Sequence, residues 1–444
     1  MRATRLQPLD RQILALAVPA FAALVAEPLF LLADAAIVGH LGTLPLAGLG
    51  IAGALLATAV GVCVFLAYGT TSTVGRRIGA GDLRGALSTG IDGMWLALGL
   101  GLVLGGAAAI AAPWLVTTLG ASPDVAPFAV TYLRWSLPGL PAMLVVLAAT
   151  GVLRGLQDTR TPLYVAAAGA AVNGVLNWVL VYPLDLGIAG SGLGTAIAQL
   201  GMGSVLAGVV VRGARRQGAT LRPHLPGIRA AASAGVPLML RTLVLRAVLL
   251  VTTYAAARTG DTQLAAHQVV MTIWTFTTFA LDAVAIAGQA LTGRALGAGD
   301  TTAVRAATHR MLWWGTGLGV VLSVLLIGVH RVVGAAFTSD PAVQGAIAAA
   351  LLVAAITQPL SGYVFVLDGV LIGAGDGRYL AVASVVTLVA YLPLVALVSV
   401  AGPAGTPGLV WLWVAFAGGF MGVRAVTLGL RTRGDGWMVV GAVR

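Results

Sequence analysis

The chain has 444 residues, of which 59% are hydrophobic and only 9% are charged. So few charged side chains cannot cover the surface of a soluble protein of this length, so the composition predicts an integral membrane protein with many spans. The formal net charge is +11. The arginines stand in short loops between apolar stretches, so we interpret them as topology signals and expect no nucleic-acid partner.

Twelve apolar stretches are long enough to cross a bilayer as helices, which takes roughly 20 residues each. We predict an all-α integral membrane fold of two six-helix bundles. An N-terminal lobe at 1–211 is followed by an arginine-rich linker at 212–234 and a C-terminal lobe with a short tail at 235–444. The predicted spans lie roughly at 12–38, 46–70, 88–112, 125–148, 162–182, 187–211, 235–257, 264–290, 308–330, 343–370, 379–400 and 408–430.

Arginine placement predicts the orientation of these spans. The loops on one side, including the linker, carry nearly all of the arginines, whereas the other side receives only Arg258 and Arg331. The positive-inside rule then places both termini and the linker in the cytoplasm. We therefore expect a multi-pass protein of the cell (inner) membrane.

The two predicted lobes repeat one sequence pattern. Gly79-Ala80-Gly81-Asp82 recurs as Gly297-Ala298-Gly299-Asp300, an offset of 297 − 79 = 218 residues. Six spans per lobe is an even number, so both lobes enter the membrane in the same direction. We expect pseudo-symmetry about an axis along the membrane normal, which is a known transporter architecture. The duplicated Asp82 and Asp300 are predicted to cap helices or to pair with arginine.

The first span carries residues that a spanning helix rarely contains. Pro19 removes one backbone hydrogen bond and permits a bend. Asp34 is a carboxylate in a place where a charge costs about 2.5–3.5 kcal/mol on insertion scales. The repeat replaces it by Thr252, so the fold does not require the acid and we interpret it as functional. Glu27 lies seven residues earlier on nearly the same helix face. It is either a second titrating group or a side chain that reaches a polar cavity.

Other polar residues in the spans are weaker candidates. Asp282 and Asp368 do not recur at the offset, and they are either functional or structural partners of Arg241 and Arg246 in the seventh span. Amides and hydroxyls in spans five and six either line a site or bond neighbouring helices. Aromatic and thioether side chains in span eight either contact substrate or pack. These candidates are Asn173, Asn177, Ser191, Thr195 and Gln199 in spans five and six, Tyr132 in span four, and Met271 and Trp274 in span eight.

Several motifs taken in order resemble the multidrug and toxic compound extrusion (MATE) transporters. They are the first-span pattern P-x14-D-A-x3-G-x-L-G, and the motifs G-x3-G-A-G-D and G-V-L-x-G-x2-D, which occur in both halves. The segments FALDAVAIAGQALTGRALGAGD and FVLDGVLIGAGDGR resemble the DinF-like branch best. The resemblance covers nearly the whole chain.

This resemblance implies cation-coupled export by alternating access. The family's coupling aspartate matches Asp34, its bending proline matches Pro19, and its partners in the N-terminal lobe match Tyr132, Asn173 and Thr195. Two departures are visible. Asn177 stands where many relatives carry a second aspartate, and span seven has Arg241 and Arg246 where some relatives have a cation-binding glutamate.

We therefore predict an antiporter, coupled to H⁺ in preference to Na⁺, that exports amphipathic and often cationic organic compounds. A flippase for lipid-linked or polysaccharide precursors is the alternative within transport. An integral membrane enzyme is the least favoured class, because no cluster of His, Asp or Ser stands at a membrane face. The five histidines show no metal-ligand spacing, so we expect no metal and no cofactor beyond the coupling ion. The expected partners are small organic substrates and the lipid bilayer, and the expected state is a monomer.

Overall fold

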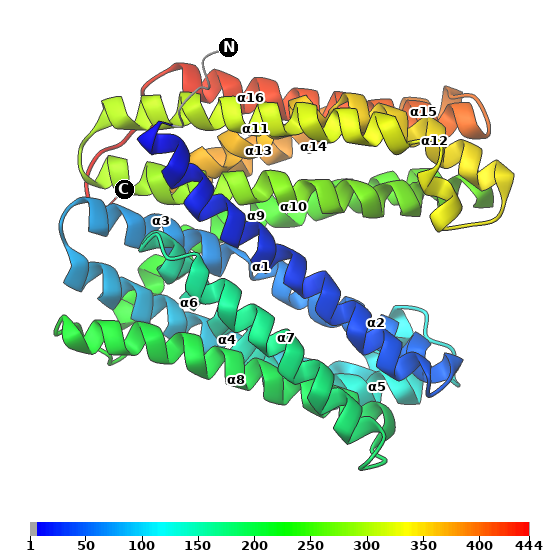
Figure 1. Ribbon diagram of the computed structural model, residues 1–444, viewed down its shortest axis with the longest axis horizontal. Helices are drawn as coiled ribbons and strands as arrows, with labels where there is room; N and C mark the ends of the chain where they lie inside the picture. Colours follow the sequence, from blue (N-terminus) through cyan, green and yellow to red (C-terminus); the bar gives the residue numbers. More distant parts are fainter. Residues whose placement is uncertain (1–6, 444) are drawn as a thin grey trace. The chain divides into compact units, whose positions relative to one another are not determined.

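The computed structural model describes residues 7–443, and the described residues form helices and turns without any strand (Figure 1). In the first half of the chain the helices are α1 (Pro8–Gly39), α2 (Thr43–Val62), α3 (Phe65–Gly79), α4 (Leu83–Thr118), α5 (Ala126–Ser136), the 3₁₀ turn η1 (Leu137–Gly139), α6 (Leu140–Gly155), α7 (Arg160–Val181) and α8 (Gly187–Arg216).

The second half begins after a short connection at 217–224. It contains α9 (Leu225–Ala257), α10 (Asp261–Gly297), α11 (Thr301–Val329), η2 (Val333–Ala336), α12 (Pro341–Ile356), α13 (Gln358–Gly373), α14 (Gly377–Ala401), α15 (Thr406–Trp413), the π-helical η3 (Val414–Phe420) and α16 (Met421–Arg433).

The predicted all-α membrane fold with twelve spans is confirmed. Within the described residues, eleven helical segments are long and apolar enough to cross a bilayer, and the pair α12 and α13 forms a twelfth span that bends by 51°. The bend lies just before Pro359, which is in the first turn of α13. Proline has no backbone N–H, so it cannot continue the hydrogen bonds of a preceding helix. Its repeat partner Pro141 lies in the first turn of α6, after the 3₁₀ turn η1.

The chain divides into two compact units. One contains Ala22–Met239, in which α7 packs on α8 and α6 packs on α3, α4 and α8. The other contains Leu240–Ala442 with the described part of Met1–Phe21, and here α13 packs on α10, α11 and α16. The divisions fall inside α1 and α9, so each of these helices contributes residues to both units.

The duplicated glycine-rich turns have the predicted role. Asp82 precedes α4 and accepts a hydrogen bond from the Gly85 backbone N–H at 2.7 Å. Asp300 precedes α11 and accepts one from the Ala303 N–H at 2.8 Å. Each carboxylate therefore caps one helix start, and the first also pairs with Arg77 at 3.0 Å.

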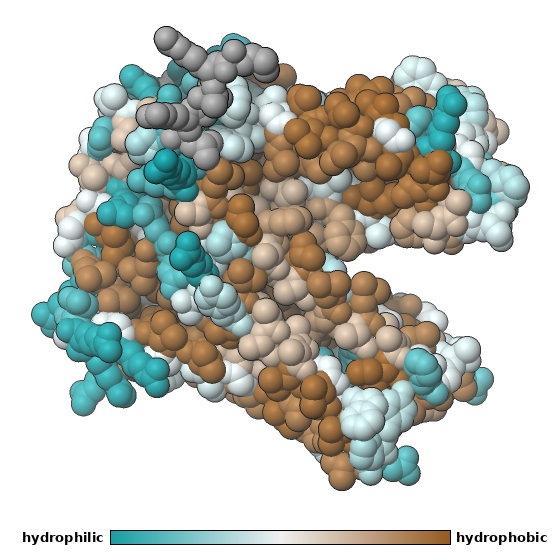
Figure 2. All heavy atoms as spheres, viewed as in Figure 1, coloured by the Kyte–Doolittle hydropathy of each residue, from teal (hydrophilic) through white to brown (hydrophobic). Residues whose placement is uncertain are grey.

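Large apolar side chains cover the outside of the helices. Ile110 on α4 is 85% exposed and Val400 at the end of α14 is 88% exposed. Figure 2 shows hydrophobic residues along the sides of the helices in each unit, with hydrophilic residues gathered at helix ends. Surfaces of this kind are unfavourable in water and suit the hydrocarbon region of a bilayer.

Candidate functional site

Asp34 lies in the last turns of α1 and is buried inside the unit Ala22–Met239. Its carboxylate accepts three hydrogen bonds. The Asn177 amide donates to Oδ1 at 2.9 Å, the Ser191 hydroxyl donates to the same oxygen, and the Tyr132 hydroxyl donates to Oδ2 at 3.0 Å. No arginine or histidine pairs with Asp34 within the described residues. Neutral donors from other helices therefore hold this acid.

A second layer of polar groups holds those donors. Asn173 and Asn177 exchange hydrogen bonds through their amides at 3.3 and 3.2 Å. The Thr195 hydroxyl lies 3.4 Å from the Tyr132 hydroxyl and accepts from the Asn173 amide at 3.4 Å. All of these side chains are buried. The network connects α1 to α5, α7 and α8 and leaves the carboxylate as its single formal charge.

Helical spacing brings these side chains to the carboxylate. Asn173 and Asn177 lie four residues apart on α7, and Ser191 and Thr195 lie four residues apart on α8, so each pair shares one helix face. Gly194 permits the close approach of the two helices. A Cβ atom at that position would lie 2.0 Å from the Asn177 Oδ1, so any larger residue would displace the amide that bonds Asp34.

The repeat places a neutral pair at the corresponding positions of the other unit. Asp34 and Asn173 correspond to Thr252 and Tyr391, because 34 + 218 = 252 and 173 + 218 = 391. The hydroxyls of Thr252 and Tyr391 lie 2.6 Å apart and both side chains are buried. Both units therefore have buried polar side chains at these two positions, but only one unit has a carboxylate there.

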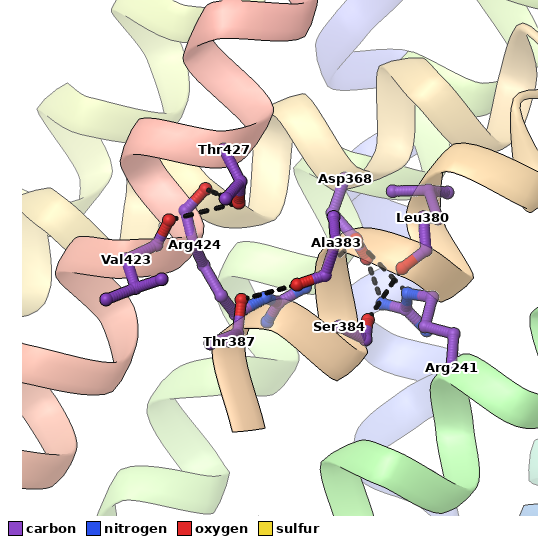
Figure 3. Close-up of polar contacts among 9 residues, drawn as sticks. All are labelled: Arg241, Asp368, Leu380, Ala383, Ser384, Thr387, Val423, Arg424 and Thr427. Atoms are coloured by element: carbon purple, nitrogen blue, oxygen red, sulfur yellow. Dashed lines mark hydrogen bonds and ion pairs between the residues drawn. The ribbon is translucent and has the colours of Figure 1, made fainter. Parts of the chain in front are cut away.

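The second intramembrane acid, Asp368 on α13, is held by two arginines. Arg241 on α9 donates through Nε to Oδ1 at 3.1 Å and through a second nitrogen to Oδ2, and Arg424 on α16 donates to Oδ1 at 2.9 Å. Figure 3 shows both guanidinium groups directed at the carboxylate. Of the two alternatives for Asp368, the structure favours a structural partner of Arg241, since buried charges require pairing.

The other predicted residues lie outside the Asp34 network. Glu27 and Arg246 are exposed, and Asp282 and Met271 are half-buried. Gln199 is half-buried and makes no hydrogen bond to the network. Trp274 packs edge-on against Phe416 with ring centroids 5.1 Å apart, as the packing alternative expects. Pro19 lies inside α1, which is one continuous helix, two residues before the division between the units.

The structure identifies the partners of two further buried residues. Ser191 was a candidate in span six, and its spacing of four from Thr195 was the available signal for its contact with Asp34. Asp10 is 0% exposed and accepts hydrogen bonds from Arg310 at 2.5 and 2.7 Å and from the Trp314 indole at 2.9 Å. Nothing in the local sequence indicates this pairing, because its partners lie about 300 residues away.

The site can accept a proton or hold a small cation. A carboxylate with no resident cationic partner is free to take up positive charge. The oxygen atoms of Asp34, Ser191, Tyr132 and Thr195, with the amide oxygens of α7, are the ligand type that hard cations prefer. Within the described residues, no group of three or more His, Cys, Asp or Glu side chains is arranged to hold a metal.

Comparison with known proteins identifies the family. The MatE family model matches residues 19–179 and 237–397, and the two segments begin 237 − 19 = 218 residues apart. The chain is 31% identical over 440 residues to Protein DETOXIFICATION 44, chloroplastic, of Arabidopsis thaliana, covering 95% of this chain and 82% of that protein. It is 29% identical over 376 residues to DNA damage-inducible protein F of Escherichia coli (strain K12), covering 82% and 81%.

A solved crystal structure of MATE in the straight conformation has the same fold. Its TM-score to this structure is 0.86, with 21% sequence identity, over 97% of this chain and 96% of that one. The family model follows both halves of the internal repeat, and the curated relatives align along most of the chain. The chain therefore belongs to the MatE family, the multidrug and toxic compound extrusion (MATE) efflux transporters, which are multi-pass membrane proteins and not enzymes.

Proposed function

We propose that the protein is a cation-coupled antiporter that exports amphipathic, often cationic organic compounds, with Asp34 as the coupling group and H⁺ as the preferred ion. The observation that carries this proposal is the asymmetry of the repeat. One unit holds a buried carboxylate bound only by neutral donors, and the other holds the Thr252–Tyr391 pair. Burial of a carboxylate in the membrane costs free energy, and the fold does not require an acid at this position. We therefore infer that Asp34 has a function that depends on its charge.

A proton on Asp34 changes the hydrogen bonds that tie α1 to its neighbours. The protonated oxygen becomes a donor, so the group that donated to it loses its acceptor. The hydroxyls of Ser191 and Tyr132 can rotate and accept instead, whereas the amide nitrogen of Asn177 can only donate. The two charge states of Asp34 therefore favour different positions of α1, which is the differential interaction that a coupled conformational change requires. A Na⁺ ion would compete for the same oxygen atoms.

Pro19 is the proposed bending point of α1. Proline interrupts the backbone hydrogen bonds of a helix and lowers the cost of a bend. The position lies fifteen residues before Asp34, so a bend there would move the carboxylate end of the helix without requiring α1 to unfold.

The test uses the full chain in proteoliposomes with a fluorescent cationic substrate. A pH gradient and a Na⁺ gradient are imposed separately, and Asp34→Asn is compared with wild type. We expect normal abundance of the variant, because removal of an intramembrane charge does not impair insertion, and loss of gradient-driven export. The control is Asp82→Asn at a duplicated helix cap. Export by Asp34→Asn at the wild-type rate against a gradient would overturn the proposal.

We also propose that both termini face the cytoplasm of an inner membrane. In this orientation the turns at Gly79 and Gly297 are cytoplasmic. Single cysteines at these positions, in a Cys63→Ala background, should resist impermeant thiol reagents added to intact cells. Labelling of either turn from outside would contradict this orientation.

A further inference from the structure

A groove on the unit Ala22–Met239 is lined by residues that are not part of the Asp34 network. It has a volume of about 410 Å³ and runs between α4, α6 and α8, which pack against one another (Figure 1). Its walls include Leu98 on α4, Val145 on α6 and Leu200 on α8. The polar side-chain groups in the lining are the hydroxyl of Ser204 and the indole of Trp95. The groove therefore suits a hydrocarbon chain and not a charged solute.

The length of the groove matches one leaflet of a bilayer. Its lining on α8 runs from Leu200 through Gly203, Ser204 and Ala207 to Val211, so the lining forms one stripe on the helix face. Eleven residues at 1.5 Å rise span about 16 Å. Half of a hydrocarbon core of about 30 Å is about 15 Å. A lipid chain anchored at one membrane surface would therefore fill the groove to the middle of the bilayer.

Positive charge stands at one end of this stripe. Arg215 follows Val211 by four residues, on the same face of α8, and Arg222 follows the lining residue Leu221 directly. Both arginines are exposed. No acidic residue occurs between Leu200 and Arg229, so nothing in this segment neutralises them. Basic residues at the end of a cleft between spanning helices are typical of sites for anionic lipid headgroups.

Contacts from one face of α4 hold the connection at 217–224 at this end of the groove. The Trp95 indole donates to the Leu221 carbonyl at 3.0 Å, and Asp92 accepts from the His224 backbone N–H at 3.2 Å. Trp95 is 40% exposed, and half-exposed indoles of this kind favour the membrane interface. These two contacts hold Leu221 at the end of the groove, and they therefore also position the next residue, Arg222.

We propose that this groove binds one acyl chain of an anionic phospholipid of the surrounding bilayer, with the phosphate held by Arg215 and Arg222. The apolar lining selects the chain, and the two arginines select a negatively charged headgroup over a zwitterionic one. The lipid stabilises the packing of α4 on α8 and the docking of the connection. Coupling by Asp34 does not require this site.

The test is native mass spectrometry of the purified full chain in detergent, titrated with dioleoyl phosphatidylglycerol or dioleoyl phosphatidylcholine. We expect one phosphatidylglycerol to be retained with higher affinity than phosphatidylcholine. An arginine near a membrane surface contributes about fivefold to affinity, so Arg215→Gln with Arg222→Gln should weaken phosphatidylglycerol binding about 25-fold. Arg216→Gln is the matched control, because Arg216 is also exposed at the end of α8 but lies off the stripe.

A second pair of variants tests the acyl chain. Ala207→Trp fills the groove and should abolish retention of both lipids, whereas Val205→Trp, at a 53% exposed position outside the lining, should retain them. The arginine variants change only exposed side chains, so they decide the question even if Ala207→Trp does not fold. Equal retention by wild type and the double arginine variant would overturn the proposal. Equally tight binding of glycerol phosphate without chains would also overturn it.

Discussion

Replacement of Ser191 by alanine tests the hydrogen bonds of the coupling carboxylate directly. Ser191 is fully buried and donates one of three hydrogen bonds to Asp34. A hydrogen bond to a charged group contributes about 1.5–3 kcal/mol, and 1.36 kcal/mol corresponds to one pH unit. The lost bond is stronger to the ionised carboxylate than to the protonated one, from which the Ser191 hydroxyl can only accept. Ser191→Ala therefore favours the protonated form, and we expect the midpoint of the pH dependence of export to rise by about 1 unit.

The assay is substrate export by proteoliposomes over a series of matched internal and external pH values with a fixed gradient. Ser204→Ala on the same helix is the control, because Ser204 lies outside the Asp34 network. A proton and Na⁺ compete for the same carboxylate, so the direction of the shift is the same for either coupling ion. A midpoint unchanged from wild type, or moved to lower pH, would refute the assignment of Ser191 as a stabiliser of ionised Asp34.

Two further predictions follow from the buried acids. Asn177→Asp places a second carboxylate where the amide now lies 2.9 Å from Asp34. Two carboxylates this close cannot both ionise readily, so the pH profile of export should separate into two steps. A single unchanged step would contradict the contact between position 177 and Asp34. Arg310→Met removes the ion-pair partner of Asp10 and should lower the midpoint of thermal unfolding, because the carboxylate keeps only its hydrogen bonds from Trp314 and from the Gln7 backbone N–H. Thermal unfolding in detergent measures this loss, with Arg305→Gln in an exposed pair as a control expected to lose less stability. Equal losses would show that burial of Asp10 does not matter.

The span pattern and the repeat were predictable because each is a local property of the sequence. A helix that crosses the hydrocarbon region must form its backbone hydrogen bonds internally and present apolar side chains to the lipid. Each span therefore appears in the sequence as a continuous apolar run. The 218-residue offset marked Asp34 as an acid that the scaffold does not need. The break in the tenth span was not predicted, although Pro359 provided a local signal for it.

The sequence by itself therefore determined the membrane class, the number of spans, the duplication and the presence of one unduplicated acid in the first span. The tertiary structure decided which side chains meet that acid. Its donors lie 98, 143 and 157 residues away along the chain. It also decided that Asp368 has two arginine partners, one of them 127 residues away. Hydropathy sets whether a helix spans the bilayer, but the rotation of each helix about its axis depends on packing against its neighbours.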